Sequence, residues 1–173
     1  MGGVLPDYIE PLRLAEAGAH LNGAIPAERM PRLAPLLIKG ADAGDVCVDF
    51  HFNDDGEGHP VLTGRLTATL PVSCQRCLQA MTVRIDAPVR LRMVRDEGET
   101  PPDVDVLLVT TEAMSLAHIA EEELLLSMPM TARHPQADCP VKLPRGQGPA
   151  GEHPFAALAA LKREGRTKHS DVK

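Results

Sequence analysis

Two cysteines lie three residues apart in the segment Cys74-Gln75-Arg76-Cys77, a spacing that places two sulfur ligands on one side of a tight turn. A second pair of potential ligands, His134 and Cys139, follows further along the chain in the sequence His-Pro-Gln-Ala-Asp-Cys. Together the four residues offer three thiolates and one imidazole, a donor set that zinc takes in structural sites. They are therefore a candidate site for one structural zinc ion.

Two other interpretations of the cysteine pair stay open. The thiols can be free and pack locally as small apolar groups, with no metal bound. The pair can also be a thioredoxin-like redox motif, which expects the first cysteine at a helix N-terminus that follows a strand. Here the flanking patterns are strand, turn and strand, which favours a structural role over a redox role. Cys47 lies on the outward phase of its strand and is left out of the site.

The elements that must position these residues are read from hydrophobic periodicity. Apolar residues alternate with polar ones over 46–52, 62–70 and 83–93, which predicts three strands of an antiparallel sheet with one face on the core. Residues 20–25 and 104–109 predict further extended segments, and the sheet could curl toward a barrel. Residues 26–37 predict a short N-terminal helical stretch, which Pro31 and Pro35 limit to short pieces. Ser115 is a predicted N-cap of the main helix, which Pro129 ends. The fold class is therefore α+β.

The chain divides into a body and a tail. Residues 1–139 are expected to form one domain, 140–153 a linker rich in proline and glycine, and 154–173 a C-terminal helix with a basic tail. Phe155, Leu158 and Leu161 form an apolar stripe on this helix. The stripe either docks back on the domain or binds a partner in a groove.

Charge restricts where RNA could bind. Residues 1–139 hold 11 basic against 21 acidic residues, whereas 140–173 hold 7 against 3. An acidic body is not the usual footprint of a nucleic-acid binder. One local surplus of arginine stands out, and it is the candidate RNA contact: Arg65, Arg76, Arg84, Arg90 and Arg92. The alternative is that these side chains form a solvated outer sheet face. A content of only 2% aromatic residues argues against base stacking on an aromatic platform.

The remaining motifs limit the function classes. The sequence contains no phosphate-binding loop, no dinucleotide-binding glycine pattern, no H-E-x-x-H and no G-x-S-x-G. No nucleophile, base and oxyanion donor can be assembled, so we expect neither an enzyme nor a small-molecule substrate. The first thirty residues lack an apolar signal core, and no apolar run approaches a membrane span. A cytoplasmic protein without a membrane partner is therefore expected.

Several of these features occur in an order that resembles a known family. Cys-Gln-Arg-Cys-Leu stands between two strand patterns, followed by an acidic loop, a helix ending Glu-Leu-Leu-Leu-Ser-Met-Pro, the His134 and Cys139 pair, and His-Pro-Phe-Ala-Ala-Leu-Ala-Ala-Leu-Lys. From about residue 9 to 165 the chain resembles the bacterial YceD family of large ribosomal RNA subunit accumulation proteins. The resemblance implies a non-catalytic role in synthesis, processing or stability of 23S ribosomal RNA. The implied partner is that RNA or a pre-ribosomal particle, met directly or through a protein. The alternative function is thiol-redox or zinc handling through Cys74 and Cys77.

Overall fold

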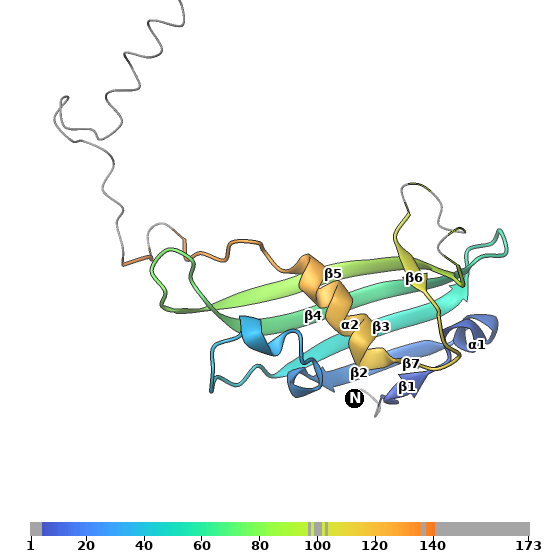
Figure 1. The fold of residues 1–173 in the computed structure, drawn as a ribbon, viewed down its shortest axis with the longest axis horizontal. Helices are drawn as coiled ribbons and strands as arrows, with labels where there is room; N and C mark the ends of the chain where they lie inside the picture. The colour runs from blue at the N-terminus through green and yellow to red at the C-terminus, as the bar shows by residue number, and fades with distance from the viewer. Residues whose placement is uncertain (1–4, 97, 99–101, 103, 136–137, 141–173) are drawn as a thin grey trace, which may run out of the picture. The chain divides into compact units, whose positions relative to one another are not determined.

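The structure, a computed structural model, describes residues 5–96, 98, 102, 104–135 and 138–140. Within them lie seven strands, two α-helices and two short 3-10 helices (Figure 1). In chain order they are β1 (Tyr8–Ile9), α1 (Pro11–Glu16), β2 (His20–Pro26), η1 (Ala27–Arg29), η2 (Ala34–Leu36), β3 (Asp45–Asp54), β4 (Pro60–Ser73), β5 (Ala80–Val94), β6 (Val106–Leu108), β7 (Met114–Ser115) and α2 (Leu116–Ser127).

A five-stranded sheet with the order β2-β3-β4-β5-β6 forms the centre of the fold. Its first four strands are antiparallel neighbours, and β6 joins β5 in the parallel direction. The predicted α+β class and the antiparallel sheet are confirmed. The barrel-like alternative is wrong, because within the described residues β2 and β6 are the open edges of this sheet. Strands β1 and β7 form a separate antiparallel pair.

The alternation in the sequence becomes the two faces of the sheet. Side chains at every second position of β3, β4 and β5 are buried, as the period of two requires. The largest of them that are almost fully buried are Phe50, Phe52, Leu62, Leu66 and Leu70. Gly64 occupies the same inward phase of β4, with φ +154°. A Cβ there would overlap the backbone carbonyl of Asp49, so the close approach of β3 and β4 requires glycine.

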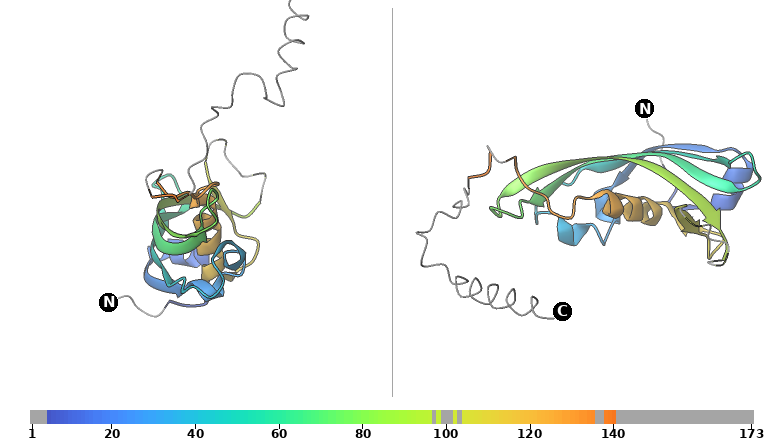
Figure 2. Two further views of the ribbon diagram at one scale, coloured as in Figure 1. Left: turned by 90° about the vertical axis from the view of Figure 1, so that its left-hand side faces the viewer. Right: turned by 90° about the horizontal axis from the view of Figure 1, so that it is seen from above.

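Two helices cover the inner face of the sheet. The sheet arches over α2, which contacts β4 and β5, while α1 packs against β3 and β4 (Figure 2). Burial of Leu116, Ile119 and Leu124 on α2 supplies much of the contact. Ser115 caps this helix as predicted, since its side chain accepts a hydrogen bond from the His118 backbone N–H at 3.3 Å. The helix α1 and the strand pair β1 and β7 were not predicted.

One acidic residue of α2 lies inside the protein. The run Glu121 to Glu123 is typical of a solvated helix face, but the Glu121 side chain is only 1% exposed. Its Oε1 atom accepts hydrogen bonds from the backbone N–H groups of Arg32 at 2.6 Å and Leu33 at 3.0 Å. Glu121 is therefore not part of a solvated helix face. Its carboxylate joins α2 to the segment between η1 and η2.

The predicted linker over 140–153 and the C-terminal helix over 154–173 lie, apart from Pro140, outside the described residues, as do Phe155, Leu158 and Leu161. The division of the chain at residue 139 stays a prediction. In the part of the chain that the structure describes, no helix is both long and apolar enough to cross a membrane.

Candidate metal centre

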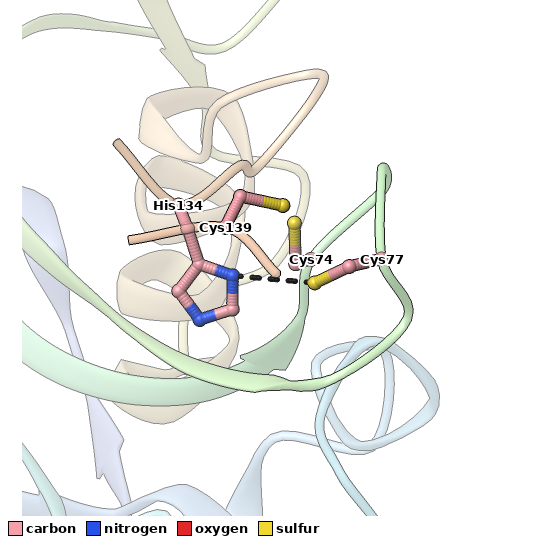
Figure 3. Close-up of side chains that lie close together, drawn as sticks. All are labelled: Cys74, Cys77, His134 and Cys139. Carbon is pink, nitrogen blue, oxygen red and sulfur yellow. Dashed lines mark hydrogen bonds between the residues drawn. The ribbon is translucent and has the colours of Figure 1, made fainter. Parts of the chain in front are cut away.

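The four predicted ligands meet at one end of the sheet. Cys74 and Cys77 lie in the turn between β4 and β5, while His134 and Cys139 lie in the segment after α2 (Figure 3). Their ligand atoms all lie within 4.8 Å of one another. Around a tetrahedral zinc ion with Zn–S bonds of about 2.3 Å, neighbouring donors lie roughly 3.5–3.8 Å apart. The ligand atoms therefore need to close by no more than about 1 Å to enclose a metal of this kind.

The turn itself is folded around the two sulfur atoms. The backbone N–H of Cys74 donates to the carbonyl of Gln79 at 2.9 Å, and that of Leu78 donates to the carbonyl of Cys74 at 2.8 Å. Leu78 adopts φ +62°, the left-handed conformation that usually requires glycine. Its side chain is 77% exposed, so packing does not compensate the strain. The turn keeps this conformation because the hydrogen bonds on both sides of Leu78 fix it.

Backbone donors stabilise a thiolate at Cys74. Burial raises the pKa of this thiol, but hydrogen bonds from the backbone N–H groups of His134, Cys77 and Arg76 outweigh it and lower the pKa to about 5. Cys74 is fully buried, so this charge is held by protein dipoles rather than by water. The thiolate is the form that binds metals. The site therefore has one sulfur ligand that is ready to coordinate at neutral pH.

The pKa of Cys77 shifts in the opposite direction. The backbone N–H of Gln79 lowers its pKa, but burial and the neighbouring Cys74 and Cys139 raise the pKa above its usual value. Its Sγ atom lies 3.4 Å from Nδ1 of His134. A thiol proton shared with that nitrogen fits this distance. A divalent cation would replace the proton, because a coordinating thiol is deprotonated outright.

The orientation of His134 is set by its second nitrogen. Nε2 lies 3.1 Å from the carbonyl oxygen of Ala80, which can only accept, so Nε2 carries the hydrogen. In the neutral ring Nδ1 then presents its lone pair to the sulfur atoms. Metal-binding histidines usually donate their other N–H to a carbonyl or carboxylate in this way. The ring is therefore oriented as a ligand requires.

Arg76 connects the two halves of the site. Its Nε donates to Sγ of Cys139 at 3.0 Å, and one terminal nitrogen donates to the backbone carbonyl of His134 at 3.0 Å. A further backbone hydrogen bond joins the N–H of Gln75 to the carbonyl of Ala132 at 2.8 Å. The guanidinium thus offsets negative charge on sulfur and holds the segment after α2 against the turn. The sequence analysis assigned Arg76 to RNA contact and did not predict this role, although its position inside C-x-x-C could have suggested it.

The other predicted RNA-contacting arginines lie outside this centre. Arg84 and Arg90 are exposed on the outer face of β5. Arg65 forms an ion pair with Asp86 at 2.5 Å, and Arg92 donates to Asp55 at 3.1 Å. The structure thus places four of the five arginines on one sheet face and the fifth, Arg76, at the cysteines. Their role toward RNA stays a prediction.

The fold and the site together define an α+β protein with a Cys3His group that could hold a metal ion. The profile of the family described as "Large ribosomal RNA subunit accumulation protein YceD" matches residues 62–162, which include all four residues of that group. One relative is the large ribosomal RNA subunit accumulation protein YceD of Haemophilus influenzae. It is 23% identical over 172 residues, which cover 92% of this chain and 97% of the relative. No solved structure is significantly similar to the chain. The chain belongs to the YceD family.

Proposed function

We propose that this protein is a non-catalytic ribosome-biogenesis factor that supports the synthesis, processing or stability of 23S ribosomal RNA in the cytoplasm. The observation that carries the proposal is membership of a family described by accumulation of the large ribosomal RNA subunit, together with a full-length relative of that name. The protein acts by binding the RNA or a pre-ribosomal particle, directly or through another protein. Deletion of the gene tests this role.

Cells that lack the protein should show a lower ratio of 23S to 16S ribosomal RNA and fewer large subunits on sucrose gradients. A plasmid copy of the gene should restore both quantities. Unchanged RNA levels and unchanged subunit profiles in the deletion strain would contradict the proposed role.

The outer face of β5 is the surface proposed to meet RNA. Within the described part of the chain, no carboxylate forms an ion pair with Arg84 or Arg90. They are six residues apart on one strand face, so their Cα atoms lie about 20 Å from each other. Two phosphates of an RNA backbone can be reached at once over such a distance. The contacts would then depend on charge rather than on base sequence.

Direct binding can be measured with fragments of large-subunit RNA at several salt concentrations. Replacing both Arg84 and Arg90 by alanine should weaken binding, and each lost phosphate contact should flatten the log–log salt dependence by about 0.7 to 0.9. The double variant Arg13→Ala/Arg29→Ala is the matched control, because it also removes two positive charges, from arginines that are paired with Glu10 and Asp7. Equal loss in the control would assign the effect to net charge alone.

The cysteine group is proposed to hold one structural zinc ion. Four protein ligands fill a tetrahedral shell and leave no position for a substrate, which is the arrangement of structural rather than catalytic zinc sites. The metal would tie the β4–β5 turn to the segment after α2, because each supplies two of the ligands. Cys77→Ser should therefore lower stability and metal content without abolishing any turnover.

Thiol-redox or zinc handling is the second candidate, and the low pKa of Cys74 is the observation that favours it. Redox activity requires a thiolate that a disulfide can reach. Cys74 is 0% exposed and lies in a turn between strands, so access opposes this function. Reduction of a model disulfide by the purified protein, lost in Cys74→Ser, would establish the redox function. Absence of that reaction would leave the structural role.

A further inference from the structure

A second group of metal-binding side chains lies on the outer face of β2 and β3, among residues that the cysteine centre does not use. His20 on β2 stands directly opposite His51 on β3 in the antiparallel register. Asp49 lies two residues before His51 on the same strand, so its side chain emerges on the same face. The hydrogen-bonded ladder thus fixes three ligating residues next to one another.

The side chains of this group converge on one oxygen atom. Nε2 of His20 lies 2.5 Å from Oδ1 of Asp49, and Nε2 of His51 lies 3.5 Å from the same oxygen. The two imidazole rings stack with their centroids 4.0 Å apart and their planes 3° from parallel. The ligand atoms of all three residues lie within 4.8 Å of one another. The lone pair of each Nε2 lies in its ring plane, so a cation would reach both nitrogens and the carboxylate oxygen once at least one of the two stacked rings turns toward it.

The donor types of this group suit a metal ion. Two imidazoles and one carboxylate form a nitrogen and oxygen ligand set that suits borderline divalent transition metals. The side chains are about half exposed, with 48%, 50% and 52% of their surface accessible. Further coordination positions would therefore be open to solvent.

A comparable group in the β3–β4 turn lacks this capacity. Asp55, Glu57 and His59 also lie close together, but the Asp55 carboxylate already accepts hydrogen bonds from the backbone N–H groups of Glu57 and His59 and from Arg92. Its lone pairs stabilise the turn and the neighbouring strand. His59 is nevertheless as exposed as His20, which makes it a suitable control.

We propose that His20, Asp49 and His51 form an exposed site for a divalent transition-metal ion, separate from the cysteine centre. Three protein ligands hold the ion, and water or an external ligand completes the shell. The site needs neither the cysteines nor the ribosomal role, so it stands or falls independently of the proposed function.

Cobalt(II) is the probe that distinguishes the two centres. Thiolate ligands give a sulfur-to-cobalt charge-transfer band in the near ultraviolet, whereas histidine and aspartate give none. Tag-free, full-length protein titrated with cobalt alone should bind one equivalent that adds nothing to that band, whether or not the cysteines bind another. Paramagnetic shifts of the His20 and His51 ring protons in NMR spectra should accompany this binding.

Variants on the exposed face locate this equivalent. His20→Ala removes one of the three protein ligands and Asp49→Asn removes the charge of the carboxylate ligand, so each should weaken cobalt binding at this site by more than about tenfold. His59→Ala should leave it unchanged. The proposal is overturned if the wild-type protein binds no such equivalent, if His20→Ala binds it equally well, or if His59→Ala loses it to the same extent. Circular dichroism of each variant checks that the sheet is intact.

Discussion

Removal of the Glu121 carboxylate should destabilise the fold far more than removal of the neighbouring Glu122 carboxylate. Glu121 is 1% exposed and accepts two backbone hydrogen bonds from Arg32 and Leu33. Glu122 is 48% exposed and forms a surface ion pair with the Arg32 side chain at 3.0 Å. The two residues are adjacent on α2, so they differ mainly in burial and in the donors that they satisfy.

The magnitude follows from these donors. Leu33 is fully buried, so its N–H would lose a charged acceptor with no water to replace it, at about 2 to 3 kcal/mol. The N–H of Arg32 is partly accessible to water, and its loss should contribute about 1 kcal/mol. Glu121→Ala should therefore lower the free energy of unfolding by about 3 to 4 kcal/mol. Glu122→Ala should lower it by less than about 1 kcal/mol, as exposed ion pairs do.

Urea denaturation followed by circular dichroism measures this difference. With a slope of about 1.5 kcal/mol per M, Glu121→Ala should move the midpoint by roughly 2 M. Glu121→Gln should fall between the wild type and Glu121→Ala, because one side-chain oxygen remains to accept. Equal midpoints for Glu121→Ala and Glu122→Ala would refute the reasoning, since burial and backbone pairing would then have no measurable effect.

Three further predictions concern the turns and the sheet. Leu78→Gly should raise the free energy of unfolding by about 0.5 to 1 kcal/mol, because relief of the left-handed strain exceeds the added chain entropy. Thermal unfolding measures this gain, and a variant less stable than the wild type would contradict the strain. Gly64→Ala should lower the free energy of unfolding by at least about 3 kcal/mol, because the new Cβ overlaps the backbone carbonyl of Asp49. Near-wild-type stability would disprove that contact. The N–H of Glu57 and the neighbouring groups lower the pKa of Asp55 to about 2. The stability that ionised Asp55 contributes is thus complete above about pH 4 and is lost as the pH falls toward 2. Asp55→Asn should flatten the pH dependence of the free energy of unfolding between these values. An unchanged pH dependence in this variant would contradict the contribution of Asp55.

Much of the fold follows from the sequence because its signals are local. Alternation over 46–52, 62–70 and 83–93 gave the central strands, since one face of each must be buried. The serine cap and the proline that follows likewise predicted where α2 begins and ends. The Cys3His grouping was also predicted, because ligand types of this kind are rare enough to stand out in a short chain.

The features that were missed depend on contacts between distant segments. Glu121 is part of an acidic run, and nothing near it shows that the N–H groups of Arg32 and Leu33 will meet it. The stacking of His20 on His51 was also missed, because it depends on the register of β2 against β3. Such pairings arise only when the sheet assembles, and a one-residue change of register would abolish them.

Elemental analysis with thiol titration on the purified native protein tests the proposed metal centre most directly. The arrangement of Cys74, Cys77, His134 and Cys139 predicts one zinc per chain that survives extensive dialysis, with three thiols protected. The exposed Cys47 should react freely. Four freely reacting thiols and no bound metal would contradict the proposal.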